Sequence, residues 1–409
     1  MTFAGCGVAL LQRSDVNTGV LVLGLTGLFG AFLLAYGLLR WRQPGAPGKA
    51  LVATGVTYFV IQMISYLLND LDEVKLYHNQ VMFMVAIPGM LLLIRADKSS
   101  REELLQLAYR VSAAVVYISV VLAVVAPTVA FGSRLGDERR WQVFGLENRL
   151  SGITPHQNLL AVTAIICILL ALHLRSKWWP LTIFVCVVAI ALSEARNAAL
   201  TAIAVLVLYW LINGKLSPQR LVVAAAGGLL VYYLATNVLT GDASDLTAGV
   251  DNLNNRSEIW DAVTAAWGQH YFFGWGPTSF VVGSGAPFST LGYYNAHNQF
   301  FEAIAEGGLF GLLAMTVFLV VLAAIAWRNR HEALYICLLV AMLASSLTEV
   351  FFTVHQYGIS YAAIPAFLVL IVFNAGTRPS ENRNDQHSDT PPDSGVQDVL
   401  RVPVRSTRP

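Results

Sequence analysis

The chain has 409 residues, of which 56% are hydrophobic and only 12% are charged. Soluble domains carry about 25% charged residues, so this composition excludes an ordinary soluble protein and indicates a membrane protein. The formal net charge of +1 says little about partners, and we expect membrane lipids but no nucleic acid among them. The four cysteines lie far apart in the sequence, so we expect neither a metal site nor a disulfide framework.

Apolar segments that could cross a bilayer recur along most of the chain. A helix needs about 20 mainly apolar residues to do so. We predict eleven spans, with residues 1–12 resembling the end of a further apolar segment: 18–39, 50–68, 80–94, 109–132, 157–174, 178–193, 196–213, 220–239, 307–327, 332–353 and 357–375. The predicted fold is an all-α, polytopic transmembrane helical bundle of about 11–12 spans within residues 1–375.

Basic residues divide the connections between these spans into two alternating sets. One set carries three, four, two, two and two Lys or Arg: "RWRQPGAPGK", "RADKSSREELLQLAYR", "RSK", "GKLSPQR" and "RNR". Cytoplasmic loops are enriched in Lys and Arg, so we assign this set to the cytoplasm. The extracytoplasmic side then receives residues 69–80, 133–156, the turn 193–196 and a large loop at about 240–306.

The C-terminal residues 376–409 differ in composition from the rest of the chain. They are polar and include five prolines with several Ser and Asp. Such a segment buries too little apolar surface to fold, so we predict a disordered cytoplasmic tail.

Several arginines lie on the predicted extracytoplasmic side. Arg196 stands in "ALSEARNAALTAIAVLVLYW", between two apolar runs that leave almost no aqueous loop. An arginine placed toward the bilayer interior costs at least about 2.5–3.5 kcal/mol, so it usually pairs or serves a ligand. Glu194 could be its structural partner. The cluster of Arg134, Arg139, Arg140 and Arg149 could instead be a solvated face or contact anionic lipids.

The large loop contains an amphipathic helix. In "NNRSEIWDAVTAAWGQHYFFGWGPTSF", Ile259, Trp260, Val263, Ala266, Trp267 and Tyr271 recur at three- and four-residue steps. We predict that this helix lies on the membrane surface with its tryptophans at the interface. Asn254 or Asn255 could cap it, which would put Arg256 in its first turn. The "GWG" sequence at 274–276 then predicts a turn.

The stretch "YYNAHNQFFEAIAEGGLFGLL" places His297 at the outer start of a membrane helix. Polar residues there can simply cap the helix or face water, and Asn295 could be such a cap. A helix N-terminus disfavours an imidazolium, so His297 could instead be a neutral base. Asn298, Glu302 and Glu306 follow on one face at four-residue spacing, which predicts a polar cavity rather than lipid beside them.

Arg196, Arg256 and His297 together indicate a type of chemistry. Arginine forks bind phosphate oxygens bidentately, and a neutral histidine can remove a proton from a hydroxyl group. These groups suit a donor with a diphosphate leaving group and a hydroxyl nucleophile.

The order of "SEARNAAL", then "NNRSEIWDAV" with "GWGPTSF", then "HNQFFEAIAEGGLFGLL" resembles the bacterial O-antigen ligase and O-antigen polymerase superfamily. "RLSGITPHQNLLA" (149–161) and "SSLTEVFF" (345–352) resemble further stretches of it. The similarity covers about residues 130–355. Its most specific part is the histidine motif. The first of these further stretches adds Arg149 and Asn158 as possible site-lining residues, with Asn298, Glu302 and Glu306.

The resemblance implies a multi-pass enzyme of the bacterial inner membrane with an extracytoplasmic site. Such an enzyme transfers a glycan from undecaprenyl diphosphate to a sugar hydroxyl, with neither cofactor nor metal ion, in cell-surface polysaccharide assembly. His297 matches the essential histidine, and Arg196 and Arg256 match the diphosphate-binding arginines. The acceptor is the lipid A core of lipopolysaccharide in a ligase, or another lipid-linked repeat in a polymerase.

A transporter or flippase of lipid-linked saccharides is the alternative. It would also be polytopic and could bind a diphosphate with arginines. The sequence shows no internal repeat and no obvious pair of broken helices, and its ionisable residues gather on one side, with Glu349 near the outer end. These features favour the glycan transferase.

Overall fold

The computed structural model describes residues 46–69, 98–131, 149–154, 156–213, 251–277, 279–280, 285–293 and 295–350. All regular structure in these ranges is helical, which confirms the all-α fold class. The elements are α3 (Ala46–Leu68), α5 (Lys98–Val125), α6 (Pro127–Ala130), α7 (Gln157–Leu174), α8 (Trp179–Ser193), α9 (Arg196–Asn213), α11 (Asp251–Trp267), the 3-10 helix η2 (Pro287–Leu291), α12 (Gln299–Arg328) and α13 (Ala333–Ser346).

Four described helices are long and apolar enough to cross a membrane: Leu105–Val125, Gln157–Leu174, Arg196–Asn213 and Gln299–Arg328. The helices α7 and α9 have the bounds that the apolar runs predicted. The helices α5 and α12 begin earlier than predicted, at Lys98 and Gln299. The predicted spans 18–39, 80–94, 220–239 and 357–375 and the tail 376–409 lie outside the described residues.

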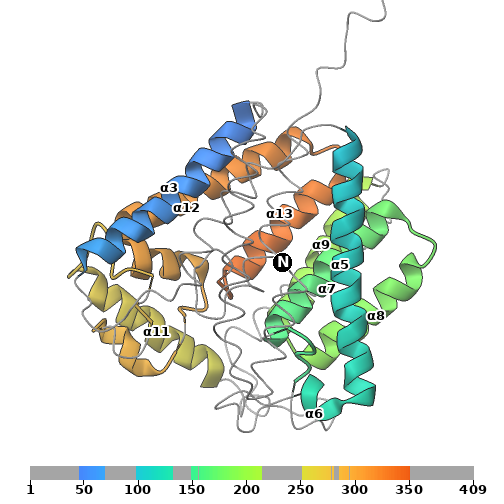
Figure 1. The fold of residues 1–409 in the computed structure, drawn as a ribbon, viewed down its shortest axis with the longest axis horizontal. Helices are drawn as coiled ribbons and strands as arrows, with labels where there is room; N and C mark the ends of the chain where they lie inside the picture. The colour runs from blue at the N-terminus through green and yellow to red at the C-terminus, as the bar shows by residue number, and fades with distance from the viewer. Residues whose placement is uncertain are drawn as a thin grey trace, which may run out of the picture.

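The helices form two groups with α13 between them (Figure 1). On one side α7 packs against α5, α8, α9 and α13, and on the other α3 runs along α12. Most of α7 is fully buried, because its side chains are apolar on every face.

Connections that the pattern of basic residues assigned to the extracytoplasmic side lie together at one end of the bundle. There the Leu150 amide donates to the Leu192 carbonyl at 2.9 Å, at the end of α8, and the Ser151 amide donates to the Ala130 carbonyl at 3.1 Å. The Asn69 side chain, just after α3, donates to the Gly274 carbonyl at 2.8 Å. We call this the site end of the bundle.

The helix α12 is broken at Gly308, whose φ and ψ are 59° and −150°. The 271–276 loop lies against the break and bonds to its peptide groups on both sides. Its four backbone hydrogen bonds are Trp275 N to Ala305 O (2.7 Å), Gly276 N to Glu306 O (3.0 Å), Leu309 N to Tyr271 O (2.9 Å) and Phe310 N to Phe272 O (3.1 Å). A break in a membrane helix is tolerated where neighbouring protein supplies such partners. The sequence had given no obvious sign of a broken helix, because an apolar run that contains a glycine is still predicted as one continuous helix.

The sequence predicted that the apolar face of the amphipathic helix α11 lies on the membrane. That prediction is wrong, because protein covers this face. Its Ile259, Val263 and Ala266 are buried against a small core made by residues that follow it: Trp275, Phe280, Ala286, Phe288, Ala296 and Ala305. These residues supply a protein surface for the apolar face of α11, which periodicity alone cannot distinguish from a lipid surface. The helix also begins at Asp251, so Arg256 lies in its second turn rather than its first.

Candidate functional site

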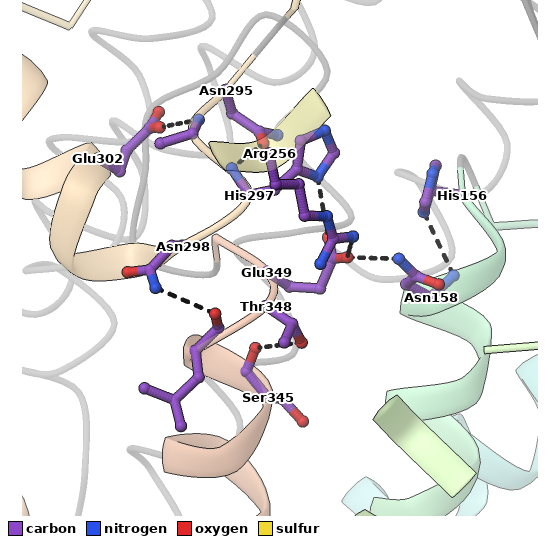
Figure 2. Close-up of polar contacts among 12 residues, drawn as sticks. His156, Asn158, Arg256, Asn295, His297, Asn298, Glu302, Ser345, Thr348 and Glu349 are labelled. Carbon is purple, nitrogen blue, oxygen red and sulfur yellow. Dashed lines mark hydrogen bonds and ion pairs between the residues drawn. The ribbon is translucent and has the colours of Figure 1, made fainter. Parts of the chain in front are cut away.

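The carboxylate of Glu349 is the centre of a polar cluster at the site end (Figure 2). Glu349 is only 5% exposed and lies just beyond the end of α13. Its Oε1 accepts a hydrogen bond from Asn158 Nδ2 and lies 3.5 Å from Arg256 Nη2. Its Oε2 lies 3.9 Å from His297 Nδ1. The cluster therefore joins α7, α11, the start of α12 and the end of α13.

The start of α12 is tied to the end of α13 by Asn298. Its Oδ1 accepts the amide hydrogens of Phe300 and Phe301, at 2.9 and 3.3 Å, and its Nδ2 donates to the Leu347 carbonyl at 3.0 Å. Asn298 is thus the N-cap, rather than Asn295. Asn295 accepts instead from the amide of His297 at 2.8 Å, where the backbone has a φ of 49°. These bonds hold the imidazole of His297 toward Glu349 (Figure 2).

The start of α7 is fixed by a second histidine. His156 has extended backbone geometry, and its Nδ1 accepts the amide hydrogen of Asn158 at 3.3 Å. This capping bond leaves the Asn158 side chain free to turn toward Glu349. Asn158, which the sequence predicted only as a site-lining residue, therefore contacts the carboxylate directly.

Donor groups surround the Glu349 carboxylate. Burial disfavours a lone carboxylate, and here Arg256 Nη2 and His297 Nδ1 lie 3.5 and 3.9 Å from its two oxygens. Arg256 and Glu349 balance each other in charge.

Arg196 belongs to a second polar group at the same end of the bundle. It is the first residue of α9 and interacts electrostatically with Arg149 and Glu194. Arg149 Nε lies 3.7 Å from Glu194 Oε2. Arg149 and Arg196 thus both interact with the Glu194 carboxylate, so the expected partnership of Arg196 with Glu194 is present.

Glu302 and Glu306 lie in a buried seam between α12 and α3. Both are fully buried, so they face protein rather than lipid, but they pack toward α3 instead of lining the polar cavity that their spacing predicted. Glu302 Oε2 accepts the amide hydrogen of Ala296 at 2.7 Å, and Glu306 accepts from Gln62 Nε2. Gln62 also donates to the Tyr58 hydroxyl at 2.9 Å. This seam is packed against α3, on the side of α12 away from Glu349.

Sequence reasoning noted Glu349 only as an ionisable residue at the end of an apolar run. Its place at the centre of the cluster was missed, and so were Tyr58 and Gln62 on α3. A carboxylate in a membrane helix usually marks a functional site, so that signal was available for Glu349. In the ranges that the structure describes, no group of three or more His, Cys, Asp or Glu side chains is arranged to hold a metal ion.

Comparison with protein families decides the class of the protein. Residues 158–316 match the family described as O-antigen ligase. The chain contains an O-antigen ligase domain. Compared with curated proteins, it matches none. The matched segment of this O-antigen ligase-like protein begins at Asn158 and includes Arg196, Arg256 and His297. Glu349 and Arg149 lie outside it, and the fold brings them to the same end of the bundle.

Proposed function

We propose that this O-antigen ligase-like protein transfers a glycan from an undecaprenyl-diphosphate carrier to a sugar hydroxyl. Its family is one of membrane glycan ligases and polymerases, and its apolar helices are those of a multi-pass membrane protein. The observation that carries the proposal is the contact of one buried carboxylate, Glu349, with both Arg256 and His297. It brings a phosphate-binding group and a base together.

Arg256 is the group that holds the donor diphosphate. Its guanidinium has five N–H donors, and Nη2 faces Glu349 at 3.5 Å. The remaining donors are available to phosphate oxygens, which accept such bonds in pairs. Arg196 and Arg149 add a second positive group at the same end of the bundle. Two positive groups suit a diphosphate, whose charge is spread over two phosphoryl groups.

His297 acts as the general base. Its Nδ1 faces Glu349, which leaves Nε2 on the opposite side of the ring for the acceptor. The acceptor oxygen forms a bond to the anomeric carbon as the bond between that carbon and the diphosphate oxygen breaks. The diphosphate leaves with the electron pair, and the hydroxyl proton passes to Nε2.

Glu349 positions the histidine and stabilises its protonated form. A carboxylate beside Nδ1 selects the tautomer in which Nε2 is the acceptor, and it stabilises the imidazolium once the proton has moved. The separation of 3.9 Å is longer than a hydrogen bond, so the pair would tighten when substrate binds.

The site end faces the extracytoplasmic side of the bacterial inner membrane in this proposal, and the C-terminus lies in the cytoplasm. The alternation of basic connections supports this orientation. The acceptor is a saccharide or glycolipid: lipid A core for a ligase, or a second lipid-linked repeat for a polymerase.

The test is transfer by the purified protein, reconstituted with a lipid-diphosphate glycan and an acceptor and without added metal ions. We expect a transferred or lengthened glycan, and a loss of about 10²–10⁴-fold in turnover for His297→Ala at saturating donor. Donor binding should remain, because the arginines hold the diphosphate. The matched control is His331→Ala, which removes a half-exposed histidine in the turn between α12 and α13. Normal turnover in folded His297→Ala would exclude His297 as the general base.

A flippase of lipid-linked saccharides is the second candidate, and the break in α12 is the observation that favours it. Transporters often place broken helices at their substrate sites. The two functions differ in product. A flippase moves the intact donor across the bilayer without consuming it, whereas a transferase releases undecaprenyl diphosphate. Donor translocation in vesicles without any new glycosidic bond would select the flippase.

A further inference from the structure

The peptide group between Ala296 and His297 is hydrogen-bonded at both of its ends. Its carbonyl, that of Ala296, accepts from the indole Nε1 of Trp260 at 2.8 Å. Its N–H, that of His297, donates to Asn295 Oδ1 at 2.8 Å. The N–H of the preceding peptide, that of Ala296, donates to the Glu302 carboxylate (Figure 2). Side chains from α11, from the loop and from α12 therefore fix the orientation of the backbone beside the histidine.

This orientation decides where the imidazole of His297 points. The backbone of His297 has a φ of 49°, in the left-handed region that residues with a side chain rarely adopt. The angle φ is the rotation about the N–Cα bond, so a peptide group that could turn would relax to a negative φ. The imidazole would then swing away from Glu349, whose Oε2 lies 3.9 Å from Nδ1. The hydrogen bonds to this peptide thus hold a strained backbone that aims the histidine.

Trp260 also belongs to the helix that carries Arg256. The two residues are four positions apart on α11, so their side chains leave the same face of the helix, about 6 Å apart along its axis. The indole is stacked on Phe301 of α12, with ring centroids 5.1 Å apart and planes at 2°, which sets the direction of Nε1. A closed path of contacts results. It runs from Glu349 to Arg256, along α11 to Trp260, and through His297 back to Glu349.

We propose that Trp260 is a positioning residue that holds the base, His297, in register with the diphosphate-binding Arg256. Its indole N–H attaches the backbone beside the histidine to α11, so one helix carries the guanidinium and orients the imidazole. In this role Trp260 acts through His297 rather than on the substrate. The roles of Arg256 and His297 rest on the proposed function, whereas the attachment can be tested without the reaction.

The variant Trp260→Phe isolates the hydrogen bond, because a phenyl ring keeps the stacking on Phe301 and lacks the N–H. The matched control is Trp267→Phe on the same helix, where the indole donates to the Tyr271 carbonyl at 2.9 Å and stacks on the Tyr271 ring. That carbonyl also accepts from the Leu309 amide, so it keeps a partner in the control variant. If Trp260→Phe does not fold, 3-benzothienylalanine in place of Trp260 exchanges the N–H for sulfur in a ring of the same shape.

The first test measures hydrogen exchange of the backbone amides in the purified full chain without substrate. In Trp260→Phe we expect the amides of Ala296 and His297 to exchange about 10-fold faster than in the parent, the factor that corresponds to one lost hydrogen bond. Exchange in α7 should keep the parent's rate, and Trp267→Phe should leave the amides of Ala296 and His297 unchanged. Unchanged exchange at both residues in Trp260→Phe, or an equal acceleration in α7, overturns the proposal.

The second test measures turnover at saturating lipid-diphosphate donor, per donor-binding site. In Trp260→Phe we expect turnover to fall about 10-fold with an unchanged dissociation constant of the donor, and in Trp267→Phe we expect the parent's turnover. In the His297→Ala background, Trp260→Phe should cause no further loss, because it acts through the histidine. Unchanged turnover in Trp260→Phe, or a further 10-fold loss in the double variant, overturns the proposal.

The two tests also separate this inference from the proposed function. A parent protein that transfers no glycan but shows the expected exchange pattern would reject the proposed function and support the attachment of His297 to α11. A parent that transfers glycan, with neither exchange nor turnover changed in Trp260→Phe, would support the proposed function and reject the positioning role.

Discussion

The break in α12 predicts a large loss of stability for Gly308→Ala. A Cβ at this position would lie 2.5 Å from the amide nitrogen of Gly274 and 2.6 Å from the carbonyl carbon of Phe272. Backbone atoms cannot turn aside as a side chain can, so the 271–276 loop would have to move away from the helix. The φ of 59° with a ψ of −150° also belongs to a region that is nearly restricted to glycine.

The magnitude follows from two contributions. Placing a residue with a side chain in this backbone region costs about 1–3 kcal/mol. Displacing the loop weakens at least two of its four backbone hydrogen bonds to α12, at about 1 kcal/mol each. The expected loss is therefore about 3–5 kcal/mol, a large fraction of the stability of an ordinary domain.

Two glycines of the same protein provide controls that separate the contributions. Gly292 also has a positive φ of 74°, with a ψ of 13° in the left-handed region, but a Cβ there meets nothing within 4 Å, so Gly292→Ala should show the smaller conformational cost of a left-handed backbone alone. At Gly268 a Cβ meets nothing within 4 Å and the φ is not positive, so Gly268→Ala should change stability by less than about 1 kcal/mol. The assay is reversible unfolding of the purified variants in detergent. A Gly308→Ala loss no larger than that of Gly292→Ala would refute the steric part of the reasoning.

Three further predictions concern the site and its orientation. Glu349→Gln should lower turnover about 10- to 100-fold, less than removal of the base itself, because Gln can still accept from Asn158 but cannot stabilise the imidazolium; turnover equal to the parent's would remove Glu349 from the mechanism. Arg256→Lys and Arg196→Lys should each weaken donor binding about 10- to 100-fold, since an ammonium cannot reproduce the guanidinium fork; titration with labelled donor measures this, and unchanged affinity in either variant excludes that arginine. Cysteines introduced at Thr290, beside α11, should react with an impermeant reagent from outside the cell, and those at His331 only after permeabilisation; the opposite pattern would place the site end in the cytoplasm.

Local sequence patterns determined the parts of this protein that depend on neighbouring residues. Apolar runs predicted α7 and α9 to the residue, because a helix buried in a bundle or a bilayer is specified by continuous apolar composition. The three-to-four-residue period predicted an amphipathic α11. The histidine and arginine motifs selected Arg256 and His297 as candidate site residues, and the fold brings both to one carboxylate.

Only the tertiary structure decided which distant residues meet. Asn158 contacts Glu349 across 191 positions of sequence, and Gln62 contacts Glu306 across 244. No periodicity or spacing encodes such pairs, since they depend on how whole helices pack. Helix packing also explains why Glu306 lies apart from the His297 cluster, although both residues are near the start of α12. Helix packing also covers the apolar face of α11 with protein. It places the 271–276 loop beside the break in α12, where the loop forms hydrogen bonds with the helix backbone.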